Sequence, residues 1–289
     1  MRVGDGAGVS NATQPAALFP GQGSHTPEMR ELVAQRAPEL LERVTELVGE
    51  DPFARVQENT RYAQPAIFCA SLAGWDALGL HPSAAAGHSL GELSALAAAG
   101  VLKRDDALEL VVLRGRLMGE ARNGSMLALV GASLEDAEQI ARDGGVTLAN
   151  DNAPGQVVLS GPRELLPRAA EAAQERGRRT LPVDVAGAFH SPSMQSAVEP
   201  FRAALDDVAV HDATFPVFSC ASTRPFEDVR AELAQALVRP VRWRETVLAL
   251  HEAGARTFVE VPPGNVLARA GKRILRDCPV APLEEAVRV

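Results

Sequence analysis

The sequence lacks the features that mark several classes of protein. Its three cysteines, Cys69, Cys220 and Cys278, lie far apart without the spacing of metal ligands, so we expect reduced thiols in a cytoplasmic protein, no disulfide framework and no metal site. Lysine occurs only twice among 289 residues, the formal net charge is −8, and no basic face stands out, which argues against a nucleic-acid binder. No apolar run reaches the length of a membrane span, and the N-terminal residues lack the apolar core of a signal peptide.

The residues that are present predict a large α/β protein. Hydrophobic residues make up 46% of the chain and charged residues 23%, which is ordinary for a protein with a sizeable core. Strand and helix patterns alternate at lengths that imply a mostly parallel sheet covered on both faces. Near residue 123 the pattern changes to six short elements in the order βαββαβ, which is typical of a ferredoxin-like unit. We therefore predict a flexible lead over 1–14, a large subdomain formed by 15–123 and 190–289, and an inserted small subdomain over 124–189.

Helical periodicity and proline placement locate the helices of the first half of the chain. The pattern predicts a helix over 27–48 that is broken near Pro38, a second helix over 66–80 that begins after Gln64-Pro65, and a third from Asp105 to about Arg122. A short strand over Ala16–Phe19 ends in the tight loop Pro20–Ser24, and a later strand is expected over 215–219.

The pentapeptide Gly87–Gly91 has a G-x-S-x-G pattern with Ser89 at its centre. A run of small residues that suits a strand precedes it, and a helix-forming run follows from Glu92. In that setting the serine occupies a sharp strand-to-helix turn, where small neighbours permit a strained backbone and the helix N-terminus favours developing negative charge. The pattern indicates a nucleophilic serine. The other interpretation is a glycine-bounded start of a helix.

A serine nucleophile needs a base, and the position of His190 favours that role. It stands where the small subdomain returns to the large one, and loops at such a seam face the cleft between lobes. His88 adjoins Ser89, but side chains at neighbouring positions of a turn diverge, so we expect His88 to pack in the structure. His25 follows the first glycine-rich loop and is a second candidate to line the site. The remaining histidines are expected at the surface: His81, His211 and His251.

Arg114 lies in an apolar helical stretch, 25 residues after Ser89. An arginine in such a place either reaches the surface with its tip or pairs with a carboxylate. If Arg114 faces the cleft, its planar guanidinium suits bidentate recognition of a carboxylate on the substrate.

These features occur together in a family that the sequence resembles, the malonyl-CoA:acyl carrier protein transacylases and the related acyltransferase domains of polyketide synthases. The motifs that carry the resemblance occur in the family's order and span about residues 17 to 275: Phe19–Ser24, Gln64-Pro65, Gly87–Glu92, Arg114–Arg116, Asn152–Val158, Ala188–Ser191 and Glu260–Gly264. The resemblance implies an α/β fold with an α/β-hydrolase-like large subdomain, built on a mostly parallel sheet, and an inserted ferredoxin-like small subdomain. It further implies a monomeric acyltransferase that moves malonyl from malonyl-CoA to the phosphopantetheine thiol of an acyl carrier protein, in fatty acid or polyketide synthesis and without a cofactor.

The resemblance also implies how the reaction is catalysed. Ser89 is the nucleophile that becomes acylated, and His190 is its base. A backbone carbonyl orients the histidine in place of an acidic residue, so Asp184 is left as a strand residue. The backbone N–H groups of Gln22 and Leu90 form the oxyanion hole, where the loss of one donor typically costs about 2.7–4 kcal/mol of transition-state stabilisation.

Substrate-binding residues follow from the same resemblance. Arg114 matches the arginine that binds the free carboxylate of the malonyl group, and Gln64 and Asn152 match positions in the cleft. Phe189, just before His190, is typical of relatives that select malonyl, whereas relatives that take methylmalonyl usually have serine there. The ring is expected to occupy the space of an α-methyl group, an exclusion worth about 1–3 kcal/mol.

Four positions depart from the family's pattern. His25 stands where glutamine is commoner, and Pro262 and Asn265 replace a glycine and a lysine. Ala236 occupies a position where the family often has a glutamine that acts through its backbone carbonyl. These departures concern the fine geometry of the cleft rather than the chemistry.

Two other functions are weighed against acyl transfer. One is hydrolysis, by an acyl-carrier-protein thioesterase of the same fold or by a generic esterase, and the presence of Arg114 argues against the thioesterase. The other is a non-catalytic module that docks a carrier protein. The presence of the serine, the histidine, the arginine and both oxyanion loops argues against it.

Overall fold

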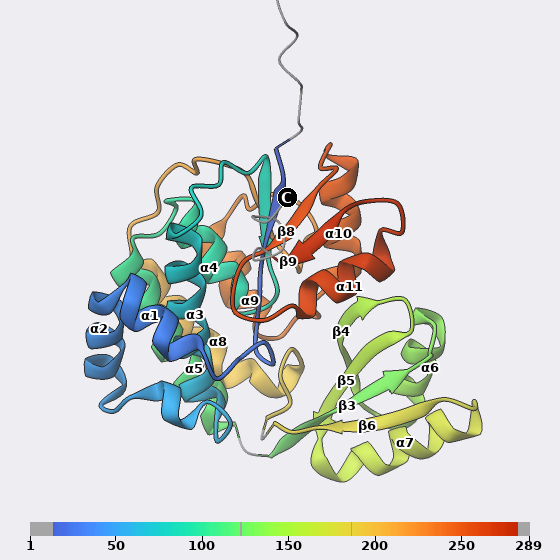
Figure 1. Cartoon of the computed structure of the whole chain (residues 1–289). Coiled ribbons are helices and arrows are strands. Elements are labelled where there is room, and N and C mark those ends of the chain that lie inside the picture. Colours follow the sequence, from blue (N-terminus) through green and yellow to red (C-terminus); the bar gives the residue numbers. More distant parts are fainter. Residues whose placement is uncertain (1–13, 122, 186, 283–289) are drawn as a thin grey trace, which may run out of the picture.

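The chain folds into two lobes, each built on its own sheet (Figure 1). The computed structural model describes residues 14–121, 123–185 and 187–282. The lead predicted over 1–14 therefore lies, apart from Gln14, outside the described residues. The larger lobe holds a five-stranded sheet, and the smaller lobe holds a four-stranded sheet formed from the middle of the chain.

The strands of the larger sheet are parallel and lie in the order β7-β2-β1-β8-β9. Their bounds are β1 Ala16–Phe19, β2 Ala84–Gly87, β7 Val217–Phe218, β8 Phe258–Glu260 and β9 Val280–Pro282. The pairing of β1 with β2 runs from Ala16 opposite Ala84 to Phe19 opposite Gly87. The loops after these two strands therefore begin side by side at the edge of the sheet where open α/β folds bind ligands.

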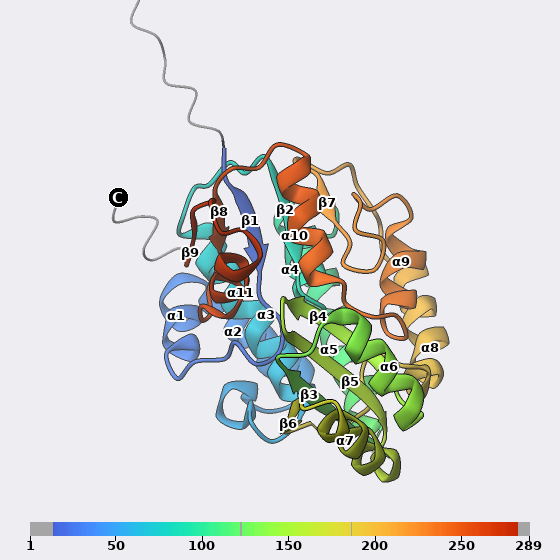
Figure 2. The same ribbon diagram turned by 90° about the vertical axis from the view of Figure 1, so that its right-hand side faces the viewer.

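Helices cover both faces of the larger sheet. Successive strand side chains point to opposite faces, so Ala17 and Phe19 pack against one helical layer, and Ala16 and Leu18 pack against the other. The first layer contains α1 Met29–Arg36, α2 Pro38–Val48, α3 Thr60–Asp76, α4 Gly91–Ala98, α5 Arg104–Glu120, α8 Gln195–Asp206 and α9 Val229–Ala236. The second contains α10 Trp243–Glu252 and α11 Val266–Ile274, which Figure 2 views from the front. Among the helices that the structure describes, none combines the length and the apolar composition needed to cross a bilayer.

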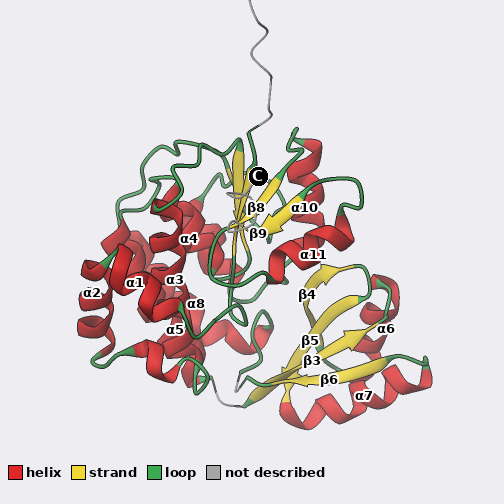
Figure 3. Cartoon of the chain, viewed as in Figure 1, coloured by secondary structure: helices red, strands yellow, loops and turns green. Residues whose placement is uncertain are grey.

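The smaller sheet is antiparallel, in the order β4-β5-β3-β6. Its elements are β3 Gly124–Val130, α6 Leu134–Gly144, β4 Thr147–Ala153, β5 Gln156–Pro162, α7 Leu166–Glu175 and β6 Arg179–Val183. Helices α6 and α7 cover one face of the sheet (Figure 3), where Leu127 and Leu129 pack against them. Met126 and Val158 belong instead to the core that the two lobes share. The predicted fold class is confirmed: a mostly parallel α/β lobe carries an inserted ferredoxin-like lobe.

The predicted start of α3 is wrong by six residues. The helix begins at Thr60 rather than at 66, because the Asn59 side chain accepts a hydrogen bond from the Arg61 N–H and caps the helix. Pro65 lies inside the helix, where it removes one backbone donor from an element that is buried over most of its length. The predicted break near Pro38 is confirmed, since α1 ends at Arg36 and α2 begins at Pro38.

Two strands and three short helices also differ from the elements predicted from the sequence. The strand expected over 215–219 is only two residues long, β7, and the strand β9 was not predicted. Short 3₁₀ helices occur at η1 Pro52–Arg55, η2 Arg163–Leu165 and η3 Pro192–Met194.

Backbone hydrogen bonds and an ion pair fix the two lobes to each other. Val241 N–H donates to Ala149 O at 2.8 Å, and Asp151 N–H donates to Val241 O at 2.9 Å, so β4 pairs with the segment just before α10. The Arg244 guanidinium then meets the buried Asp151 carboxylate at 2.8 Å. This seam holds β4 over the edge of the larger sheet at which β1 and β2 end.

The close approach of α3 to α5 predicts that Gly119→Ala destabilises the protein. A Cβ at Gly119 would overlap Asn59 Oδ1, and one at Gly115 would lie 3.2 Å from Arg61 Cα. We expect Gly119→Ala to lower the free energy of unfolding by up to about 1 kcal/mol in a denaturant titration, because loss of the Asn59 cap costs about 0.5–2 kcal/mol and the higher helix propensity of alanine offsets about 0.8–1 kcal/mol of that cost. In an Asn59→Ala background the overlap is absent and the same substitution should be neutral or stabilising. Equal destabilisation in both backgrounds would contradict this explanation.

Candidate active site

Ser89 occupies a strained turn between β2 and α4. Its backbone φ is 54°, in the left-handed region that residues with a side chain rarely adopt. A Cβ at Gly87 would overlap the Gly91 backbone, and a Cβ at Gly91 would overlap the Phe19 carbonyl. Both glycines are therefore required by close backbone contacts, and the turn projects the Ser89 side chain toward the cleft between the lobes.

His190 lies within hydrogen-bond distance of Ser89. The Ser89 Oγ and His190 Nε2 atoms are 2.8 Å apart, although the two residues are 101 positions apart in the chain. His190 Nδ1 lies 2.9 Å from Ala236 O and 3.2 Å from Arg239 O, at the end of α9. Because a carbonyl only accepts, Nδ1 carries the proton, which leaves Nε2 free to accept from the serine hydroxyl. Among the described residues, backbone carbonyls take the place that an acidic residue has in a Ser-His-Asp triad.

The charge state of His190 suits a general base. The side chain is buried, and this burial, together with the nearby positive charge of Arg114, lowers the pKa of His190 to about 3. The imidazole is therefore neutral at physiological pH and can accept a proton. The residue itself has a φ of 56°, so both members of the Ser89–His190 pair are held in left-handed backbone conformations.

Arg114 is buried beside the serine, with 4% of its surface exposed. Its Nη2 donates to Ser89 Oγ at 3.0 Å, and its Nη1 donates to Gln64 Oε1 at 2.6 Å. Burial lowers the pKa of Arg114 to about 10, while the charge of Glu92 raises it. The guanidinium thus remains cationic at neutral pH, and none of the ion pairs within the described residues includes it. The first interpretation of Arg114, a side chain that reaches the surface, is wrong.

Glu92 is a buried acid that the sequence analysis did not single out. It lies in α4, three residues after Ser89. It is 2% exposed and accepts a hydrogen bond from the Cys220 N–H at 2.7 Å. Burial raises the pKa of Glu92 to about 7, against the opposing effects of the Cys220 bond and of the Arg114 charge. The acidic residue of the G-x-S-x-G-E sequence was the available signal for a buried acid next to the serine turn.

The loop after β1 lies against the turn between β2 and α4 that holds Ser89. His88 N–H donates to Phe19 O at 2.9 Å, and a Cβ at Gly21 would overlap the His88 carbonyl. Within the described part of the chain, neither the Gln22 N–H nor the Leu90 N–H donates to a protein acceptor. Both donors are thus available to a ligand, and their role as an oxyanion hole stays a prediction.

A cavity of about 430 Å³ opens in front of Ser89, a size typical of small-molecule sites. Apolar side chains form part of its wall, among them Met118, Met126, Val158 and Phe189. The site residues predicted from the sequence line it as well: Gln22, Gln64, Ser89, Leu90, Arg114, Asn152, Phe189 and His190. The structure therefore brings all eight to one cleft, together with His25.

The remaining residues discussed in the sequence analysis have other positions, and two of them, His88 and Asp184, also line the cavity. His88 packs edge-on against Trp243 and lies 2.8 Å from Asn152 Oδ1 through its Nε2, a contact that the sequence gave no signal for. Asp184 follows β6 rather than lying in it, and it is exposed at the rim of the cavity. Pro262 and Asn265, two departures from the family's pattern, are not among the cavity's lining residues.

No group of three or more His, Cys, Asp or Glu side chains that could hold a metal ion occurs among residues 14–121, 123–185 and 187–282. The three cysteines are free thiols.

Comparison with known proteins assigns the chain to a family. Residues 27–288 match the model of the acyl transferase domain. The chain belongs to the acyl transferase family. A malonyl CoA-acyl carrier protein transacylase of Bacillus subtilis is 38% identical to it over 287 residues, which cover 90% of each chain.

Solved structures place this acyl transferase among the same proteins. An acyl-carrier-protein S-malonyltransferase of Burkholderia pseudomallei superposes with a TM-score of 0.89 at 31% identity, over 96% of this chain and all of that one. A malonyl-transacylase solved in complex with its type II polyketide synthase acyl-carrier protein has a TM-score of 0.86 at 32% identity, over 93% and 94% of the two chains.

The lowered pKa of His190 predicts a pH dependence for the reactivity of Ser89. We expect the rate at which a neutral phosphonate labels Ser89 to hold down to pH values well below 6.5, because His190 stays unprotonated there. In Arg114→Met the positive charge is gone, the pKa of His190 rises, and the acid limb of the profile moves to higher pH. Arg114→Lys keeps the charge and serves as the control. An acid limb near 6.5 in the unmodified protein, or no movement in Arg114→Met, would contradict this account.

Proposed function

We propose that this acyl transferase moves a malonyl group from malonyl-CoA to the phosphopantetheine thiol of an acyl carrier protein through a malonyl-Ser89 intermediate. The observation that carries the proposal is the buried guanidinium of Arg114, which touches the serine hydroxyl and has no carboxylate partner among the described residues. A buried cation without a carboxylate partner is costly. A substrate carboxylate supplies that partner and is held within reach of the nucleophile.

The first half-reaction transfers the acyl group to the enzyme. His190 Nε2 takes the Ser89 proton as Oγ attacks the thioester carbonyl carbon, and the carbonyl oxygen becomes an oxyanion facing the N–H groups of Gln22 and Leu90. The carbon–sulfur bond then breaks, and the coenzyme A sulfur leaves with the proton that His190 held. Malonyl-Ser89 remains, with its free carboxylate on Arg114.

The second half-reaction runs the same steps in reverse. The carrier-protein thiol gives its proton to His190 and attacks the acyl-serine carbonyl, and the serine oxygen leaves with that proton. Water is the competing nucleophile, and the apolar lining that includes Met118, Met126 and Val158 disfavours it in the cleft. These steps require no cofactor.

Several finer statements belong to the same proposal. The Phe189 ring, which lines the cavity, takes the space that an α-methyl group needs and so favours malonyl over methylmalonyl. Gln64 and Asn152 bind the substrate from α3 and β4. The enzyme acts as a cytoplasmic monomer that serves fatty acid or polyketide synthesis, and its free cysteines suit a reducing compartment.

Substitution of the nucleophile tests the reaction directly. Ser89→Ala should lower malonyl transfer by at least about three orders of magnitude, because no acyl-enzyme can form. The measurement is the mass of a carrier protein incubated with the enzyme and malonyl-CoA. Ser94→Ala is the matched control, since Ser94 is a buried serine of α4, the helix that follows Ser89, and its hydroxyl has no hydrogen-bond partner among the described residues. Malonyl transfer by Ser89→Ala at the unmodified rate would refute the proposal, and release of free malonate instead of malonyl-carrier would favour a hydrolase.

Substitution of the arginine tests substrate selection. Arg114→Ala should reduce the preference for malonyl-CoA over acetyl-CoA by about 10- to 150-fold, the value of a charge-assisted hydrogen bond of about 1.5–3 kcal/mol. Competition between the two thioesters for one carrier protein measures the ratio. Arg116→Ala removes an exposed arginine two positions along the same helix and should leave the ratio unchanged. A malonyl-to-acetyl ratio that survives Arg114→Ala would remove Arg114 from this role.

A further inference from the structure

Thr60, the first residue of α3, lies between two of the predicted site residues. Thr60 is buried, with 5% of its surface exposed. The hydroxyl donates to Gln22 Oε1 at 2.6 Å and accepts from Gln64 Nε2 at 2.9 Å. We propose that Thr60 is a positioning residue whose hydroxyl couples the oxyanion loop to the arginine that selects the substrate. This inference rests on the proposed function.

The direction of each hydrogen bond makes the threonine hydroxyl necessary. Arginine has only donors, so Gln64 must present its Oε1 to Arg114. The Gln64 amide nitrogen is then turned toward Thr60 Oγ1, with Met118 Sδ at 3.3 Å as a weaker partner. A flipped amide would place NH₂ against the guanidinium. By accepting from Gln64, Thr60 keeps the amide in the orientation that Arg114 requires.

The same hydroxyl fixes Gln22. Gln22 is exposed and lies between Gly21 and Gly23, and Gly23 has a φ of 97°. Thr60 is the hydrogen-bond partner that the structure records for the Gln22 side chain, and no other occurs within the described residues. Anchoring the side chain of a residue in a glycine-flanked loop also restrains its backbone N–H, the group proposed to face the oxyanion.

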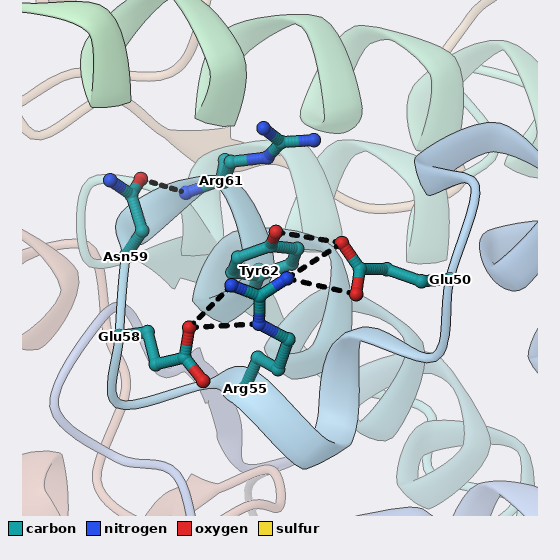
Figure 4. Close-up of polar contacts among 6 residues, drawn as sticks. All are labelled: Glu50, Arg55, Glu58, Asn59, Arg61 and Tyr62. Atoms are coloured by element: carbon teal, nitrogen blue, oxygen red, sulfur yellow. Dashed lines mark hydrogen bonds and ion pairs between the residues drawn. The ribbon is translucent and has the colours of Figure 1, made fainter.

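Side-chain contacts join the start of α3 to η1 and to the loop before it. Figure 4 shows the Arg55 guanidinium stacked on the Tyr62 ring, with its Cζ 4.5 Å from the ring centroid. The Cζ atom of Arg61 lies 4.9 Å from the same centroid. Glu50 accepts from both Tyr62 Oη and Arg55 Nη1 at 2.8 Å. Asn59 caps the helix, as described above. Tyr62, two residues after Thr60, is thus tied to Arg55 of η1 and to Glu50 in the loop before it.

The contacts join the site into one directed chain of hydrogen bonds. Arg114 donates both to Ser89 and to Gln64, Gln64 donates to Thr60, and Thr60 donates to Gln22. Two parts of the proposed mechanism, carboxylate binding and oxyanion binding, therefore share one hydroxyl. Loss of that hydroxyl should affect rate and acyl selection together.

The test compares Thr60→Val, which removes the hydroxyl, with Thr60→Ser, which keeps it. Thr60→Val should lower kcat/KM for malonyl-CoA by about 3- to 10-fold, the value of one neutral hydrogen bond, and should also lower the malonyl-to-acetyl ratio. Thr60→Ser should retain both quantities within about two-fold, since it keeps both hydrogen bonds. Rates are normalised to the folded fraction from denaturant titration. Ser71→Ala is the control: it removes from the same helix a buried hydroxyl that has no hydrogen-bond partner in the described part of the chain, and it should match the unmodified enzyme.

The outcomes separate this inference from the proposed function. Malonyl transfer by the unmodified enzyme is measured first, so failure of the function is seen before any Thr60 variant is assayed. If Thr60→Val and Thr60→Ser behave alike, or if Thr60→Val slows both acyl groups without changing their ratio, the inference is overturned. Should Thr60→Val fail to fold, Thr60→Ala replaces it, and the same comparison with Thr60→Ser decides.

Discussion

The contact between the Arg114 guanidinium and the Ser89 hydroxyl is the constraint on which the other parts of this structure depend. A buried guanidinium loses its hydration, and that loss costs several kcal/mol unless hydrogen bonds and charges offset it. Here Gln64 and Ser89 accept from it, and Glu92 supplies a nearby acid. The arrangement leaves part of the positive charge unneutralised, and that charge is directed at the place proposed for the malonyl group on Ser89.

Three elements of the larger lobe meet to build that contact. Arg114 comes from α5, Gln64 comes from α3, and Ser89 precedes α4, so the packing of these helices on one face of the parallel sheet sets the distances. Gly115 and Gly119 allow α3 to approach α5 closely. The smaller lobe closes the cleft from the other side, and the pairing of β4 with the segment at Val241 keeps it in place.

Backbone strain is found at the two residues that we propose to be the nucleophile and its base. Ser89 and His190 both have positive φ, and Thr223 is the other non-glycine residue with this property in the described part of the chain. Such conformations persist only where the surroundings determine them strongly. At Ser89 the β2–α4 turn does so, and at His190 the carbonyls of Ala236 and Arg239 hold the ring.

Much of the site could be predicted from the sequence, because most of its residues lie in short, recognisable sequence motifs. The turn at Ser89 needs small neighbouring residues, and an arginine is unusual in an apolar helix. Local pattern and family resemblance therefore identified both Ser89 and Arg114. Thr60 was missed because Pro65 was interpreted as lying just before the helix. The predicted helix therefore began at 66, and Thr60 was left in a loop. Its partner Gln22 is 38 residues away, and no periodicity records such a contact. The His88–Asn152 pair was missed for the same reason, since it joins the two lobes.

The most direct test of the central claim is to find where the acyl group rests between the two half-reactions. The enzyme is incubated with malonyl-CoA in the absence of a carrier protein, digested, and mapped by mass spectrometry. The account predicts one malonyl group on the peptide that contains Ser89, and loss of that group when a carrier protein with a free phosphopantetheine thiol is added. A malonyl group on another residue, or one that the carrier thiol cannot remove, would contradict it.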